Sequence, residues 1–66
     1  MKNILKEERQ KKQLTQTQLA EIVNVSRQTI FSIEMNKYTP SVLLSLKLAR
    51  ALDKKVEDIF KLEKSD

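Results

Sequence analysis

The chain has 66 residues, enough for one small domain but too few to bury a large hydrophobic core. It contains no cysteine and no histidine, so thiolate metal sites and the common nucleophilic triads lack their usual residues, and we expect no enzyme, no metal ion and no cofactor. Thirteen basic and nine acidic residues give a net charge of +4, which suits an anionic partner.

No part of the sequence predicts a membrane or export segment. No apolar run approaches the roughly 18 residues that a membrane span requires, and the N-terminus lacks the apolar core of a signal peptide. Repeats and linkers are also absent, so residues 1–66 are predicted to form one domain. We therefore expect a cytoplasmic protein that has no membrane partner.

The first predicted helix spans residues 3–12 and is capped by Asn3. Its apolar content is limited to Ile4 and Leu5, with Leu14 just beyond its end. This weak amphipathic pattern specifies little about how the first helix packs.

A second helix is predicted to begin after Thr15. Thr15 is a good N-cap, and Gln18 three residues later completes a capping-box pattern. Leu19, Ala20 and Val23 then fall on one face of the helix. The second helix therefore has a defined start and a side that is expected to be buried.

The second helix is interrupted at Asn24, and Ser26 can cap a third helix. A sharp turn there requires a left-handed residue, and Asn is the best substitute in a chain that contains no glycine. Two short helices joined by a tight turn are the pattern of a helix-turn-helix, which we place over residues 16–35.

The third helix has one inward face and one outward face of an unusual kind. Thr29, Ile30 and Ile33 gather on the inward face. The outward face lacks the Lys and Glu of an ordinary surface helix, and its residues are Arg27, Gln28, Phe31, Ser32 and Met35.

The chemistry of that outward face matches the edges of DNA bases. Arg can bond guanine O6 and N7, Gln can bond adenine N6 and N7, and an apolar ring can contact the thymine methyl group. A solvated helix with one exposed Phe is the alternative for this helix taken alone. We expect the base-reading residues to be Arg27, Gln28, Phe31 and Ser32.

The segment Gln16–Met35 resembles the core of the phage repressor and Cro-type helix-turn-helix family, also called XRE-type regulators. The family pattern has Gln first, Ala fifth, a turn residue ninth, and apolar residues at the fourth, eighth, tenth, fifteenth and eighteenth positions. This chain supplies Gln16, Leu19, Ala20, Val23, Asn24, Val25, Ile30 and Ile33 at those places. The resemblance extends from about Leu5 to Phe60. It implies an all-α fold, a compact bundle of five short helices that forms a lambda-repressor-like DNA-binding domain.

The resemblance also implies roles for residues outside the third helix. Arg9 corresponds to a family arginine that pairs with a glutamate at the end of the reading helix, here Glu34; two unrelated surface charges are the alternative. Gln16 corresponds to a glutamine that contacts phosphate and supports the reading helix. Glu8 stands where family members have an apolar residue, which is a departure from the pattern.

Contacts to the DNA sugar–phosphate backbone are expected from residues around the reading helix. Helix N-termini and hydroxyl groups favour phosphate, and the loop after the third helix resembles the family loop that holds the backbone. The expected residues are Gln16, Thr17, Ser26, Thr29, Lys37 and Tyr38. A packing role for Tyr38 is the alternative. Residues 1–37 contain seven basic and four acidic residues, so the basic excess lies with this half.

Two local signals predict where the third helix ends and where a fourth helix begins. Asn36 is a second candidate left-handed residue, and Ser41 caps a fourth helix predicted over Val42–Leu52. Apolar residues cover more than one face of that helix. We expect Leu46, Ala49 and Leu52 in the core and Leu43 or Leu44 outside it, where apolar surface would suit a partner.

A short fifth helix is predicted over Val56–Phe60. Ile59 and Phe60 are its apolar anchors, either in the core or at a dimer contact. The tail at residues 61–64 alternates like a strand, and residues 1–4 could pair with it as a small terminal sheet. The expected dimer interface consists of Ile59, Phe60 and Leu62.

A single reading helix covers only a few base pairs, whereas a two-fold dimer presents two such helices about 34 Å apart, which is one turn of DNA. We therefore expect a homodimer on an inverted repeat in double-stranded DNA. With no ligand or activation domain, the expected function is that of a transcriptional repressor that occludes a promoter.

Two alternatives from other classes stay open. An antitoxin would use the same DNA-binding fold, but its main partner would be a toxin protein bound through the fourth and fifth helices. A membrane-surface or scaffold peptide would use the basic charge, although the first helix lacks the broad apolar face that this role needs.

Overall fold

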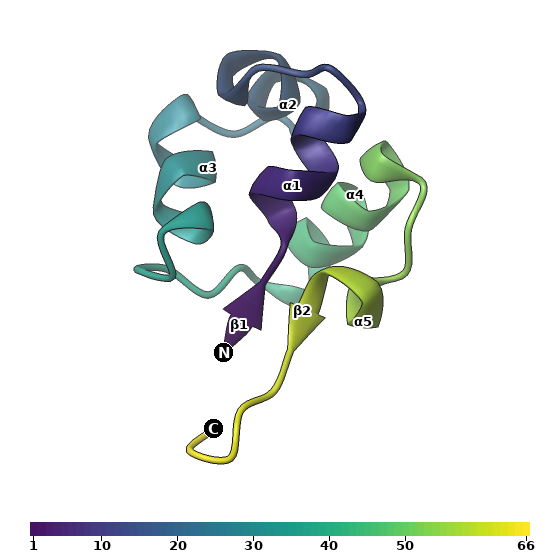
Figure 1. The fold of residues 1–66 in the computed structure, drawn as a ribbon. Coiled ribbons are helices and arrows are strands. Elements are labelled where there is room, and N and C mark those ends of the chain that lie inside the picture. Colours follow the sequence, from purple (N-terminus) through teal and green to yellow (C-terminus); the bar gives the residue numbers. More distant parts are fainter.

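The computed structural model describes residues 1–66 as five helices and a two-stranded sheet. In chain order (Figure 1) the elements are β1 (Lys2–Asn3), α1 (Leu5–Lys11), α2 (Gln16–Val23), α3 (Arg27–Glu34), α4 (Val42–Leu52), α5 (Val56–Ile59) and β2 (Phe60–Lys61). The predicted bundle of five short helices with a terminal strand pair is confirmed. None of the five helices has the length and apolar character needed to cross a bilayer.

The helix starts follow from the predicted caps. The Thr15 hydroxyl accepts a hydrogen bond from the Gln18 backbone N–H at 3.0 Å, and the Gln18 side chain accepts one from the Thr15 N–H at 2.8 Å. The Ser26 hydroxyl accepts the Thr29 N–H of α3 at 3.2 Å, and the Ser41 hydroxyl accepts the Leu44 N–H of α4 at 3.1 Å, both without the reciprocal side-chain bond. These bonds satisfy N–H groups that a helix leaves free in its first turn.

The helices α1 to α4 each end at or just before a left-handed residue, and in no case is that residue glycine. The residues with positive φ are Gln13 (58°), Asn24 (60°), Asn36 (59°) and Asp53 (56°). In each case the next residue donates its N–H to a carbonyl five positions earlier, as Lys37 does to Ser32 at 2.8 Å. Asn24 and Asn36 confirm the sequence prediction. Gln13 was not predicted, because a Gln side chain has no particular preference for this conformation.

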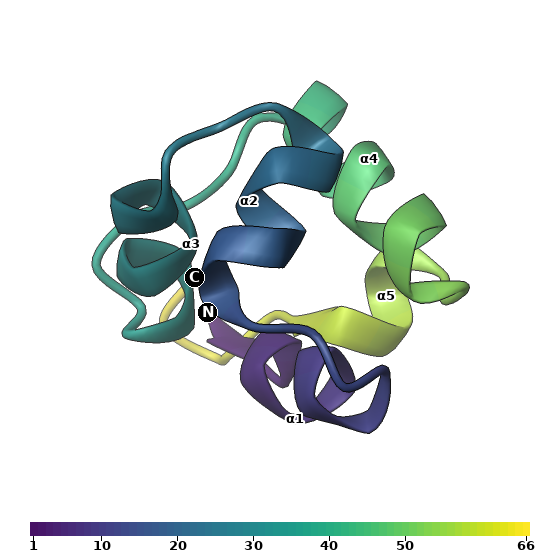
Figure 2. The ribbon, with the colours of Figure 1, turned by 90° about the horizontal axis from the view of Figure 1, so that it is seen from above.

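The core is a single cluster of twelve buried residues from all five helices and β2. Seen from above (Figure 2), α2 lies between α3 and α4. The cluster consists of Leu5, Leu19, Ala20, Val23, Ile30, Ile33, Leu44, Leu48, Ala49, Leu52, Ile59 and Phe60.

One core prediction on α4 was wrong. Leu46 is 56% exposed, whereas Leu44 and Leu48 are buried. Leu44, Leu48 and Leu52 are four positions apart and so share one helix face, and Leu46 lies between them in sequence on another face. Leu43 is exposed, as expected.

The N-terminal segment begins as a strand, not as a helix. β1 pairs antiparallel with β2, Lys2 opposite Lys61 and Asn3 opposite Phe60. The predicted terminal sheet is therefore confirmed, although it uses Phe60–Lys61 and leaves Leu62 outside. Because Asn3 belongs to β1, α1 starts at Leu5, two residues later than predicted, and α5 correspondingly ends at Ile59.

Glu8 replaces the apolar residue of the family pattern and is nevertheless buried. Its carboxylate lies 3.2 Å from the ammonium group of Lys11 and 3.9 Å from that of Lys54, which precedes α5. Both lysines are largely exposed, so the pairs neutralise the carboxylate at the edge of the core. This departure from the family pattern therefore leaves no unpaired buried charge.

The two chain termini meet beside the strand pair. The Met1 amino group lies 3.1 Å from both the Asp66 and the Glu63 carboxylates, and its hydrogen bond with Asp66 raises the pKa of the amino group. The Glu63 backbone N–H in turn lowers the pKa of the Asp66 carboxyl. These groups are exposed, so their pairing contributes little to stability.

The exposed left-handed Gln13 should be a site of stored strain. Gln13→Gly is expected to raise the free energy of unfolding by about 1 kcal/mol, because glycine adopts this conformation without a Cβ clash. For a domain of this size that corresponds to a rise in melting temperature of roughly 4–8 °C. Gln10→Gly, within α1, is the matched control and should lower the melting temperature, because glycine is a poor helix former. An unchanged or lower melting temperature for Gln13→Gly would contradict the strain.

Candidate nucleic-acid interface

The orientation of α3 is set by its two buried residues, Ile30 and Ile33. Both side chains are in the core, so the opposite side of the helix faces solvent. Arg27 and Gln28 are exposed there, and Phe31 and Ser32 are half-buried. All four residues expected to read bases therefore reach the surface, with Phe31 less exposed than the outward position suggested.

The solvent face of α3 carries no free negative charge. Glu34 is the only acidic residue of α3, and its side chain is 3% exposed. An anionic ligand could therefore approach Arg27 and Gln28 without meeting a carboxylate of α3.

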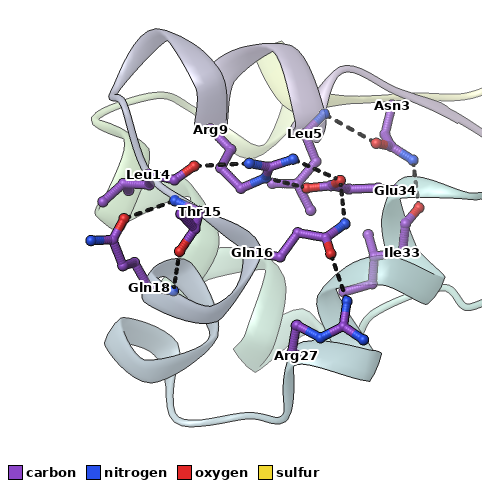
Figure 3. Close-up of polar contacts among 10 residues, drawn as sticks. All are labelled: Asn3, Leu5, Arg9, Leu14, Thr15, Gln16, Gln18, Arg27, Ile33 and Glu34. Carbon is purple, nitrogen blue, oxygen red and sulfur yellow. Dashed lines mark hydrogen bonds and ion pairs between the residues drawn. The ribbon is translucent and has the colours of Figure 1, made fainter.

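Glu34 is held by Arg9 of α1, as the resemblance implied. The Arg9 guanidinium donates from Nε to Oε2 at 2.7 Å and from Nη2 to Oε1 at 3.2 Å, a two-pronged contact (Figure 3). Its Nη1 donates to the Leu14 carbonyl at 2.8 Å. The Arg9 side chain is 9% exposed, so both charges are largely removed from water and depend on each other.

Gln16 connects this ion pair to Arg27 on the solvent face of α3 (Figure 3). Its side-chain Nε2 donates to Glu34 Oε1 at 3.1 Å, and its Oε1 accepts from Arg27 Nη1 at 3.1 Å. Only one orientation of the Gln16 amide can make both bonds. Polar contacts thus run from α1 through the end of α3 and the start of α2 to Arg27.

Three of the expected backbone-binding residues, Thr29, Lys37 and Tyr38, line a hollow beside α3. This hollow, which we call the loop hollow, has a volume of about 260 Å³ and is lined by Gln28, Thr29, Ser32, Lys37 and Tyr38. Lys37 makes no ion pair within the chain, and Tyr38 is 48% exposed. The loop hollow offers hydroxyl groups and one free ammonium group, a set that suits a phosphate group.

Ser26 and Thr17, the remaining predicted backbone ligands, do not line the loop hollow. The Ser26 hydroxyl lies 3.0 Å from the Thr29 hydroxyl and also accepts the Thr29 N–H, so both hydroxyls take part in the cap of α3. Thr17 is exposed in the first turn of α2.

Asn3 was predicted only as a helix cap, and the structure places it beside α3 as well. Its Nδ2 donates to the Ile33 carbonyl at 2.9 Å and to the Asn36 side chain at 2.8 Å. The contact spans thirty residues of sequence, so no local signal could have predicted it.

Comparison with known proteins identifies close relatives. A helix-turn-helix family profile matches residues 5–59. The HTH-type transcriptional regulator YgzD of Bacillus subtilis is 46% identical over 66 residues, which is the full length of both chains. An HTH-type transcriptional regulator of Methanocaldococcus jannaschii is 52% identical over 60 residues, or 91% of each chain.

Two solved structures have the same fold. The restriction-modification controller protein C.AhdI from Aeromonas hydrophila has a TM-score of 0.79 and 34% identity, and the match covers 85% of each chain. The clp gene regulator ClgR from Corynebacterium glutamicum has a TM-score of 0.77 and 30% identity, over 82% of this chain and 57% of that one.

The buried ion pair should behave as a unit. Glu34→Leu alone is expected to cost about 3–5 kcal/mol of unfolding free energy, because it leaves the Arg9 guanidinium buried without an opposite charge. The double variant Arg9→Met with Glu34→Leu should recover most of that loss. Urea denaturation of the two single variants and the double variant measures the coupling. Additive losses would show that the two charges act independently.

Proposed function

We propose, from the premise that the chain belongs to the helix-turn-helix family of DNA-binding transcriptional regulators, the XRE type, that it acts as a homodimeric repressor on an inverted repeat. The family is a class of regulators and not of enzymes. The observation that carries the proposal is the solvent face of α3, where Arg27 and Gln28 are exposed and the only carboxylate of the helix is buried.

Base reading is proposed for that face. Arg27 donates a hydrogen bond from Nη1 to Gln16, which leaves Nε and Nη2 free to donate to guanine O6 and N7. Gln28 has no side-chain bond within the chain and can pair with adenine. Phe31 and Ser32 follow one turn later, at neighbouring base positions. Because Gln16 already restrains Arg27, little side-chain freedom is lost on binding.

Phosphate contacts are proposed on both sides of the reading helix. On one side, the N–H groups of the first turn of α2, at Gln16 and Thr17, have no partner in a helix and point outward. On the other side, Lys37, Tyr38 and Thr29 line the loop hollow. Phosphate contacts on both sides of α3 would fix its register in the major groove.

A second copy is proposed to complete the site. Ile59 is fully buried and Phe60 is 8% exposed, so both belong to the core of one copy, and Leu62, at 84% exposure, is the one expected interface residue that retains a large apolar surface. Leu46 is exposed beside Val56 in a second hollow and adds apolar area. The chain measures 32 × 21 × 20 Å, so two copies side by side could present reading helices about one DNA turn apart.

Repression is the simplest outcome of such binding. A dimer that occupies a promoter would exclude RNA polymerase from the same DNA, and the proposed site of action is the cytoplasm. An antitoxin would share the DNA-binding face and differ in its protein partner. The comparisons add no support for a toxin partner.

Two variants separate base reading from phosphate binding. Arg27→Ala should lose about 1–3 kcal/mol of binding free energy on the preferred duplex and much less on random-sequence duplex. Lys37→Ala should weaken binding to both duplexes alike and reduce the slope of log K against log salt by about one. Fluorescence anisotropy at several salt concentrations measures both quantities. If Arg27→Ala weakened both duplexes equally, Arg27 would be a phosphate contact only.

A further inference from the structure

Asn3 joins three parts of the molecule through one side chain. Its Oδ1 accepts a hydrogen bond from the Leu5 backbone N–H at 3.0 Å, at the start of α1. Its Nδ2 donates to the Ile33 carbonyl at 2.9 Å and to Asn36 Oδ1 at 2.8 Å. Both hydrogens of the amide and its oxygen are therefore used, and Figure 3 shows the bonds to Leu5 and Ile33.

The two residues that Asn3 holds control the end of the reading helix. The Ile33 carbonyl also accepts the Asn36 N–H at 3.0 Å, and the Lys37 N–H donates to the Ser32 carbonyl at 2.8 Å. Asn36 has a φ of 59°, a conformation that glycine adopts more readily. The turn that places Lys37 at the loop hollow therefore has Asn36, and not glycine, in the left-handed position. Asn3, which belongs to β1, holds this turn through its two hydrogen bonds.

Asn3 is itself held in place by the terminal strand pair. It lies opposite Phe60 in the strand pair, and the next residue, Ile4, donates its N–H to the Ile59 carbonyl at 2.9 Å. Ile59 is fully buried and Phe60 is 8% exposed. The strand pair therefore anchors Asn3 to the core at a point that is distant in sequence from the helix-turn-helix.

We propose that Asn3 is a positioning residue for DNA binding, which holds the Asn36 turn so that Lys37 meets the sugar–phosphate backbone. This inference rests on the proposed function. Without the Asn3 donor, the turn and Lys37 would have to be ordered when DNA binds, and that ordering reduces affinity. The direct contacts of α3 with bases would stay the same.

The Asn3→Ser variant separates the two roles of this side chain, which accepts a hydrogen bond at the start of α1 and donates hydrogen bonds at the end of α3. The serine hydroxyl can still accept the Leu5 N–H, because hydroxyls make the same local turn as Asn. It ends one bond short of the amide nitrogen and cannot bridge to both Ile33 and Asn36. The change is neutral, so it does not alter the charge that phosphate meets.

DNA binding by the intact chain provides the first test. Asn3→Ser should bind the preferred duplex about five-fold more weakly, the cost of ordering about one side chain on binding, with an unchanged base preference. Added to Lys37→Ala, it should cause no further loss, because both changes remove the same contact. Wild-type affinity for Asn3→Ser, or losses that multiply in the double variant, would overturn the proposal.

Amide hydrogen exchange without DNA provides a second test that does not depend on the proposed function. The Lys37 N–H should exchange several-fold faster in Asn3→Ser, while the Leu14 N–H at the end of α1 should keep its wild-type rate. An unchanged Lys37 rate would overturn the positioning role even if the protein binds DNA. If Lys37 exchanges faster but the wild-type protein binds no duplex, the turn is held as described and the DNA-binding function is the part that fails.

Discussion

One buried carboxylate, that of Glu34, ties α3 to α1 and α2 and so holds the orientation that Ile30 and Ile33 set. Arg9 reaches it from α1 and Gln16 reaches it from α2, so three helices meet at two oxygen atoms. Desolvation offsets much of the attraction in a buried pair, so its main effect is on geometry and not on stability. Because Gln16 also accepts a bond from Arg27, the same carboxylate restrains the side chain expected to read guanine.

Both ends of α3 are fixed by groups that do not belong to it. Ser26 caps its first turn, and Asn3 binds a carbonyl of its last turn from the terminal sheet. The exposed face between these ends carries the base-reading candidates, and the turn beyond carries Lys37. A helix held at both ends loses little freedom when it enters a groove, which favours discrimination between sequences over adaptable binding.

Local signals in the sequence predicted the parts of the structure that local chemistry determines. Thr15, Ser26 and Ser41 cap helices because their hydroxyls reach N–H groups only three residues away. Leu46 was misplaced because α4 is apolar on more than one face, and periodicity alone could not select the buried one. The exposure of Arg27 and Gln28 followed from the opposite position of Ile30 and Ile33. The role of Asn3 at α3 could not be predicted, because its partners come close only through the tertiary fold.

We propose that a dimer of this protein reads a DNA sequence through α3. Selection of bound duplexes from a random pool, at two salt concentrations, tests both the dimer and the sequence reading. A dimer that reads bases through α3 should enrich an inverted repeat at both concentrations, with half-site centres about one helical turn, roughly 10 base pairs, apart. An enriched single half-site without symmetry would contradict the dimer. No enrichment at either concentration would contradict sequence reading itself.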